Sequence, residues 1–201
     1  MRFIKDILDI KNVLGKYQTF TLKIITGTSG TAFYGFTCVG DMILKYIDGG
    51  VENIETYTDY SGTLSFGYDS NTNITVEGFL TEFTRYGGRI EEADFGGMKT
   101  IENIQLSGSS QLQKLNVSGC TNLQTLNLSS CLSLYDLNIE NCSLISVIYY
   151  AANNEDVSTA IADAISNSDV NNGTLYTNSA GTYYSIIAAA AIAKGWTIAN
   201  I

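Results

Sequence analysis

The chain has 201 residues, of which 45% are hydrophobic and 15% charged, and this is enough apolar material for a folded core. Its 11 Lys and Arg stand against 20 Asp and Glu, and the net charge of -9 argues against nucleic-acid binding because it repels a phosphate backbone. Histidine is absent, so the usual general base and the commonest metal ligand are missing, and we expect no catalytic site, metal or cofactor.

The first predicted element is an amphipathic helix in residues 1–17. Its apolar side chains recur near helical spacing, and Gly15 is placed to end it. Two interpretations stay open: the helix packs on its own domain, or it docks onto a partner subunit. The side chains of the partner contact would be Phe3, Ile4, Ile7, Leu8 and Leu14. Charges interrupt this segment, so it does not resemble a signal peptide, and no apolar run of the chain is long enough for membrane insertion.

Residues 18–90 are predicted to form an antiparallel β-sandwich. Between Gln18 and Phe83 apolar and polar residues alternate with a period of two, and turn-forming sequences such as DGG and DYSG separate five or six short strands. The segment that begins at Asp69 starts like a calcium-binding loop, but Ile74 and Leu80 replace the glycine and the glutamate that such a loop requires. We therefore interpret it as a hairpin turn.

Residues 91–147 contain a repeat of eleven residues, which predicts a stacked solenoid. Its blocks read ADFGGMKTIEN, IQLSGSSQLQK, LNVSGCTNLQT, LNLSSCLSLYD and LNIENCSLISV. A ring of eleven residues is too narrow for the apolar side chains of one block, so we expect two blocks per coil of about 22 residues, within the range of leucine-rich repeats. This arrangement places Asn116 and Asn138 on one face and Gln105 and Asn127 on the other.

Two sets of residues in the repeat could carry chemistry. The sixth position of three successive blocks is cysteine, and we interpret this ladder as reduced thiols packed in the core, although four cysteines could also form two disulfides. These thiols belong to Cys120, Cys131 and Cys142. The acids Glu91, Glu92 and Asp94 form either a solvated edge or a paired-carboxylate site. The outward rows of the solenoid are either a solvent coat or a recognition surface.

Residues 148–201 are predicted to close the solenoid with a small α/β cap. Apolar stripes indicate one helix near residues 157–165 and a second near residues 183–194, with short strands in NNGTLYTN and WTIAN. We expect Leu175 and Ile198 on adjacent strands and Trp196 in the core of the cap. The fold class predicted for the chain is therefore α+β in several parts: an antiparallel β-sandwich, a short leucine-rich-repeat solenoid and an α/β cap.

The blocks LNVSGCTNLQT and LNLSSCLSLYD resemble the short leucine-rich repeats of surface proteins from gut Bacteroidetes and of their bacteriophages. The tail, NNGTLYTNSAG followed by AAAAIAKGWTIAN, is similar to the C-terminal unit that closes many of those arrays. The strands TFTLKI and ITVEGF look like those of the β-sandwich that often precedes them, although YIDGG stands where the family has a WGDG turn. The resemblance covers residues 18–201 and implies a binding or structural protein without a catalytic residue set.

From this resemblance we expect a non-enzymatic bacteriophage virion protein, which is a tail, fibre or capsid-decoration component. The lack of a signal-like N-terminus favours this interpretation over the alternative, a bacterial cell-surface adhesin module. Residues 1–17 would dock onto other virion proteins, while the repeat and cap would bind a host protein or glycan through exposed tyrosines. These tyrosines are Tyr149, Tyr150, Tyr176, Tyr183 and Tyr184. A homo-oligomer is expected because tail and fibre components are usually oligomeric.

Overall fold

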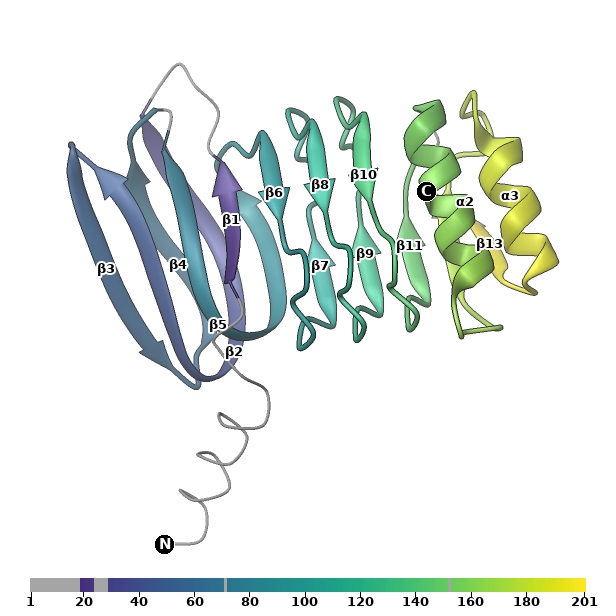
Figure 1. Ribbon diagram of the computed structural model, residues 1–201. Helices are drawn as coiled ribbons and strands as arrows, with labels where there is room; N and C mark the ends of the chain where they lie inside the picture. The colour runs from purple at the N-terminus through teal and green to yellow at the C-terminus, as the bar shows by residue number, and fades with distance from the viewer. Residues whose placement is uncertain (1–18, 24–28, 71, 152) are drawn as a thin grey trace, which may run out of the picture.

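The computed structural model describes residues 19–23, 29–70, 72–151 and 153–201. Within these residues the chain forms an elongated molecule, in which a bent sheet at one end continues into a stack of short strands and then into two helices (Figure 1). The predicted docking helix, with Phe3, Ile4, Ile7, Leu8 and Leu14, lies outside the described residues.

Thirteen strands and two helices make up the described structure. The first five strands are β1 (Thr19–Lys23), β2 (Gly30–Asp48), β3 (Val51–Thr58), β4 (Ser61–Tyr68) and β5 (Asn73–Gly87). The strands of three residues are β6 (Glu92–Asp94), β7 (Asn103–Gln105), β8 (Lys114–Asn116), β9 (Thr125–Asn127), β10 (Asp136–Asn138) and β11 (Val147–Tyr149). The last part of the chain alternates helices and strands in the order α2 (Glu155–Asn167), β12 (Thr174–Thr177), α3 (Tyr184–Ala193) and β13 (Thr197–Asn200).

The α+β, multi-part fold class expected from the sequence is wrong. Strands dominate the described residues, and they join into one mixed sheet with the path β10-β8-β6-β1-β5-β7-β9-β11-β12-β13, to which β2, β3 and β4 are attached through β5. Residues 91–147 are all described and form strands on both faces of the repeat but no helix. A block of eleven residues has room only for a short strand and its turns, so the repeat is a β-solenoid rather than a leucine-rich-repeat solenoid.

The expected two-sheet sandwich is also wrong, because β2 and β5 run through the whole N-terminal sheet. One edge of β2 pairs with β4 and then with β3, while its other edge pairs with β5. Ala32 of β2 pairs with Phe66 of β4, yet the ring centroid of Tyr46, further along β2, lies 4.7 Å from that of Phe66. A straight strand would separate residues 32 and 46 by roughly 46 Å. The single sheet therefore folds over and encloses its own apolar face.

The sheet bends at a local irregularity in its two longest strands, β2 and β5. The pairing of β2 with β5 shifts register between Val39 and Met42, as in a β-bulge. Gly78 lies opposite this point with a φ of 148°, and a Cβ atom there would come within 2.7 Å of the carbonyl oxygen of Asp41. A glycine is required at this corner because the two backbones approach so closely.

Strands β1 and β5 provide the two starting edges of the solenoid. β1 pairs with the N-terminal part of β5 on one side and with β6 on the other, while the C-terminal part of β5 pairs with β7. From these edges grow two stacks of strands: face A, made of β6, β8 and β10, and face B, made of β7, β9, β11, β12 and β13. The bent sheet thus covers the first coil, whose strand edges would otherwise be open to pairing with other chains.

Each coil of the solenoid contributes one strand to each face. Asn116 pairs with Asn138 on face A, and Gln105 pairs with Asn127 on face B, in parallel register. The residues of each pair are 22 positions apart, which confirms the predicted coil of two blocks and the predicted sharing of faces.

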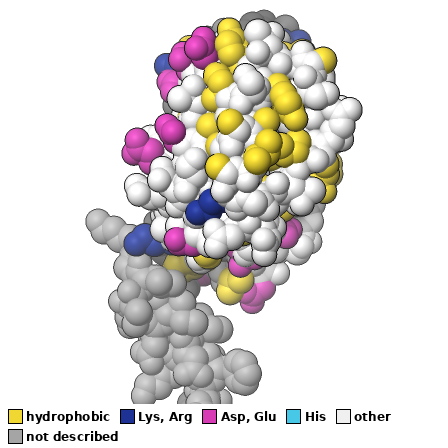
Figure 2. Space-filling model, turned by 90° about the vertical axis from the view of Figure 1, so that its right-hand side faces the viewer, with side chains coloured by type: hydrophobic (Ala, Val, Ile, Leu, Met, Phe, Trp, Pro, Cys, Tyr) yellow, Lys and Arg dark blue, Asp and Glu magenta, His cyan; other side chains and the backbone are white. Residues whose placement is uncertain are grey.

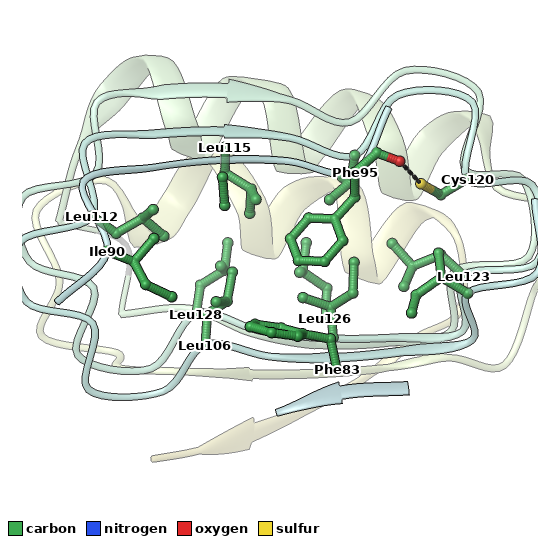
Figure 3. Packing of buried hydrophobic residues seen from close by; sticks show 14 of the residues in the cluster. Phe83, Ile90, Phe95, Leu106, Leu112, Leu115, Cys120, Leu123, Leu126 and Leu128 are labelled. Carbon is green, nitrogen blue, oxygen red and sulfur yellow. Dashed lines mark hydrogen bonds between the residues drawn. The ribbon is translucent and has the colours of Figure 1, made fainter. Parts of the chain in front are cut away.

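Inward side chains of the two faces meet in the middle of the solenoid. They come from the first, third and ninth positions of each block, and in the stack they form continuous apolar rows, such as the one that contains Leu106 and Leu128 (Figure 3). Phe83 of β5 lies beside these rows and links them to the aromatic cluster of the bent sheet, since its ring contacts Tyr34 and Phe95. One core therefore runs through the junction between sheet and solenoid.

Helices replace the strands of face A at the far end, whereas face B continues. α2 packs against β10 and α3 packs against α2, while β11, β12 and β13 remain parallel. Leu175 pairs with Ile198, and Trp196 is buried with its Nε1 atom donating to the carbonyl oxygen of Val170 over 2.8 Å, so both predictions for the cap are confirmed. A Cβ atom on Gly173 would lie 2.4 Å from the indole, which explains the glycine of the NGTL sequence.

Candidate functional site

The second residue of each block ends its strand and points away from the core. In three blocks it is an asparagine whose side-chain oxygen accepts a hydrogen bond from the backbone N–H group two residues later. The contact is 3.0 Å long for Asn116 and Asn127 and 3.3 Å for Asn138. These are Asx turns, so the asparagines of the repeat have a structural role in addition to any contact with a ligand.

Face B carries one outward row that changes from amides to aromatic rings along the stack. Parallel registers align its five members from β7 to β13: Gln105, Asn127, Tyr149, Tyr176 and Ala199. We call these residues the face B row. Because adjacent strands lie about 4.8 Å apart, the row is roughly 19 Å long.

The two tyrosines of the face B row stack on each other. The ring centroids of Tyr149 and Tyr176 are 4.2 Å apart and their planes differ by 6°. Desolvation and then the neighbouring Tyr176 raise the pKa of Tyr149, which therefore keeps its phenolic proton at neutral pH. Tyr149 covers one face of the Tyr176 ring, so the other face is directed toward β13, where the aligned side chain is only the methyl group of Ala199. The pair thus presents a ring face beside adjacent hydroxyl groups.

The other predicted tyrosines do not join this pair. Tyr150 is fully buried, and its hydroxyl group exchanges hydrogen bonds with the backbone of Asn154, so the expectation that this tyrosine is exposed is wrong. The physical reason is its position as the third residue of a further block, which points inward. Tyr183 precedes α3 and Tyr184 begins it; both are partly exposed, and both belong to the helical layer rather than to face B.

A shallow groove of about 480 Å³ lies on the outer side of face A. It is lined by Asn73, Glu92, Ala93, Asp94, Lys114, Leu115, Asn116, Asp136 and Asn138. The Oδ1 atom of Asp94 accepts hydrogen bonds of 2.8 Å from the backbone of Gly96 and from the side chain of Asn116. Glu92 lies 3.8 Å from the Nζ atom of Lys114. Glu92 and Asp94 therefore lie on one surface, but Glu92 is engaged in an ion pair and Asp94 in a turn.

A second groove, of about 550 Å³, is lined by residues of β10, of the turn that follows it and of α2. Amides and carboxylates line its rim, among them Asn138, Glu140, Asp163 and Asn167. β10 is the last strand of face A, and within the described residues the next layer is a helix rather than another strand. This groove has no aromatic lining residue, in contrast to the face B row.

The cysteines of the repeat are buried, and none of the four in the chain forms a disulfide, as predicted. Each thiol donates to a carbonyl oxygen of the preceding coil: Cys120 to Phe95 over 3.1 Å, and Cys131 and Cys142 to equivalent positions over 3.2 and 3.1 Å (Figure 3). Burial raises the pKa of Cys120 and Cys131 to about 12 and that of Cys142 to about 11. Thiols with these pKa values are poor nucleophiles near neutral pH.

No group of three or more potential metal ligands occurs among the described residues. The helices of the described part are also too short to cross a membrane. Comparisons of the chain with protein-family models, with curated proteins and with solved structures gave no match. The resemblance of the repeat and the tail to a known family remains an expectation.

The sequence carries a signal for the opposite orientations of Tyr149 and Tyr150. The predicted solenoid ends at Val147, but the next residues, IYYAANNEDVS, continue the eleven-residue pattern and place Ile148 first, Tyr149 second and Tyr150 third in a block. Extending the pattern by one block assigns Tyr149 outward and Tyr150 inward. The partner of Tyr149 could not be found in this way, because β12 follows an insertion that contains α2.

Proposed function

We propose that the chain is a non-enzymatic component of a bacteriophage virion that binds a host-surface glycan through the face B row. The observation that carries this proposal is the stacked pair Tyr149 and Tyr176, aligned with the amides of Gln105 and Asn127. Aromatic and amide groups suit the recognition of neutral polar ligands, because the ring covers apolar surface while amides and phenols exchange hydrogen bonds.

The arrangement of the row fits an extended sugar chain better than a compact ligand. The free face of Tyr176 would cover the C–H face of one sugar ring, and the phenols and amides would bind hydroxyl groups along the roughly 19 Å of the row. None of the five row members carries a charge, so binding would depend weakly on salt. The grooves next to face A carry several carboxylates and offer no ring face.

The proposal of a non-enzymatic role is supported by the chemistry of the reactive side chains. The chain has no histidine, the thiols of the repeat are buried hydrogen-bond donors, and Asp94 is engaged in a turn. The placement in a virion is supported by the resemblance of the repeat and tail to proteins of gut Bacteroidetes and their bacteriophages. In this proposal, residues 1–17 dock onto other virion proteins. The alternative is an adhesin module on the bacterial cell surface, which would use the same row.

The glycan claim is tested with two single substitutions and a panel of capsular polysaccharides purified from gut Bacteroidetes. Tyr176→Ala removes the free ring face and one side of the stack. Tyr135→Ala is the control, since Tyr135 is 47% exposed and lies outside the face B row. We expect the wild-type chain to bind one or more polysaccharides, Tyr176→Ala to weaken that binding at least tenfold, and Tyr135→Ala to bind normally. Equal loss in both variants, or none in Tyr176→Ala, would refute the assignment of the face B row.

A further inference from the structure

The last helix is apolar on all sides although one side faces outward. α3 reads YSIIAAAAIA, and its buried residues, Ile187, Ala188 and Ala191, occupy only one side of it. Ile192 on the outer side is 68% exposed, and Ala189 and Ala193 are exposed as well. Figure 2 shows apolar side chains gathered in a band over this end of the molecule. A helix that is hydrophobic all round is normally buried, and the terminal unit of a stacked repeat normally carries a polar outer face.

The strand beside this helix has an open edge. β13 is the final strand of face B, and no strand of the described residues pairs with its outer side. The N–H groups of Thr197 and Ile201 donate to the carbonyl oxygens of Gly173 and Thr177. Because N–H directions alternate along a strand, those of Ile198 and Asn200 point to the open edge.

This end of the molecule is almost free of charge, in contrast to the rest of the chain. Between Val170 and Ile201 the single charged side chain belongs to Lys194, whereas the whole chain has a net charge of -9. Two copies of an acidic protein repel each other least where they approach through a neutral surface. Self-association through this end face therefore meets little electrostatic repulsion.

We propose that two copies of this chain form a two-fold dimer through β13 and the outer side of α3. A two-fold axis at Ala199, perpendicular to face B, pairs Ile198 of one copy with Asn200 of the second copy, so that both open N–H groups and their carbonyls form hydrogen bonds. The sheet of face B then continues across both molecules. The same axis places the two α3 helices on one side of this sheet.

The spacing of the helices agrees with this arrangement. α3 connects β12 to β13 as a parallel crossover and so lies over the space between them. Across the axis, the helix of the second copy would lie two strand spacings away, or roughly 9.5 Å. Packed helices are separated by about 8–10 Å, and the small side chains of Ala189 and Ala193 permit this approach. Strand pairing and helix packing are thus satisfied by one symmetry operation.

The dimer is tested by sedimentation equilibrium of the full chain and two charged variants. Ile192→Lys places a charge on the exposed side of α3. Leu132→Lys is the matched control, because Leu132 is 64% exposed and lies in a turn of the solenoid. We expect dimers for the wild type and for Leu132→Lys at micromolar concentration, and at least a tenfold weaker dimer for Ile192→Lys with an unchanged circular dichroism spectrum.

The position of the axis is tested by a cysteine at Ala199. In an antiparallel pair centred on this residue, the two Cα atoms would lie about 4.5 Å apart, within the range of a disulfide. Mild oxidation of Ala199→Cys should therefore give a disulfide-linked dimer at dilutions where Thr121→Cys, at an exposed position of the repeat, gives none. The proposal would be overturned if the wild type were monomeric at 200 µM or formed an open-ended oligomer. It would also be overturned if Ile192→Lys left the dimer intact, or if the two cysteine variants cross-linked equally. The dimer does not depend on the glycan-binding role, since none of its tests uses a ligand.

Discussion

The fifth residue of every block adopts a left-handed backbone conformation, and this single requirement explains much of the repeat sequence. In the first three blocks the residue is Gly97, Gly108 or Gly119, with φ between 71° and 77°. In the last two it is Ser130 or Asn141, each with a φ of 60°. Glycine adopts this conformation without strain, asparagine tolerates it, and most other residues lose about 1 kcal/mol there.

Replacing Ser130 by glycine should stabilise the protein. Ser130 is exposed, so the substitution removes backbone strain without loss of packing, and part of the gain is offset by the greater freedom of glycine in the unfolded chain. We expect a net increase of about 0.5 kcal/mol in the free energy of unfolding, measured by urea denaturation. Asn141→Gly is the control and should change stability by less than Ser130→Gly. A destabilised Ser130→Gly would show that the hydroxyl group matters more than the backbone strain.

The buried thiols predict how stability depends on pH. Their folded pKa values of about 11 to 12 lie above the value of 9.0 for an unperturbed thiol. Above pH 9 the unfolded chain therefore releases protons that the folded chain retains, and the free energy of unfolding falls by about 1.4 kcal/mol per pH unit for each thiol. This loss is absent below pH 9.

The contribution of one thiol can be isolated by comparing the wild type with Cys131→Ala between pH 8 and pH 10.5. The variant should be less stable at every pH because of the cavity, but its stability should fall less steeply above pH 9. Buried tyrosines affect both proteins equally and cancel in the comparison. Parallel pH profiles would mean that the Cys131 thiol ionises as easily in the folded state as in the unfolded state.

At the scale of elements, the unit of the solenoid is the coil of two blocks rather than the block. A block alone adds a strand to one face, so an insertion or deletion of one block moves every later strand to the opposite face. An insertion or deletion of two blocks leaves every later strand on its original face. This unit could be predicted from the sequence, because a ring of only eleven residues is too narrow to hold the apolar side chains of one block at ordinary packing density. The pairs Asn116–Asn138 and Gln105–Asn127 followed from the same argument and are confirmed.

Deleting residues 115–136 should therefore leave a folded protein that is shorter by one coil. The deletion joins Lys114 to Leu137, which restores a face A strand, and α2 can still cover the end. Deleting only residues 115–125 removes half as much chain but places face B residues on face A. We expect a cooperative urea transition with reduced stability for the first variant and loss of cooperative unfolding for the second. Retention of the fold in the shorter deletion alone would contradict the two-block unit.

The bent sheet could not be predicted from the same sequence. Alternation of apolar residues identified the strands between Gln18 and Phe83, but it gives the face of each side chain and not the partner of each strand. The bulge between Val39 and Met42, which lets one sheet fold over, depends on a close approach to Gly78, and Met42 and Gly78 are 36 positions apart in the chain. The interpretation as two sheets failed because alternating patterns are the same in a sandwich and in one folded sheet.

At the scale of the whole molecule, the solenoid separates two different ends. One end is covered by the bent sheet, whereas the other exposes α3 and the edge of β13 (Figure 1). The face B row runs along the side between them and ends on β13, at Ala199. In the proposed dimer the rows of both copies would lie on the same side of one continuous sheet, so that a long polysaccharide could bind both and gain in apparent affinity.

The central claim, that the face B row is the binding surface, is tested most directly by hydroxyl-radical footprinting of the tyrosines. The chain is labelled alone and with the tightest-binding capsular polysaccharide, and modification is quantified by mass spectrometry. Tyr86 and Tyr135, which are 66% and 47% exposed, report general shielding, and the fully buried Tyr150 reports unfolding. We predict reduced labelling at Tyr149 and Tyr176 alone. Unchanged labelling of this pair in the presence of bound polysaccharide, or protection centred on Tyr86 or Tyr135, would contradict the account.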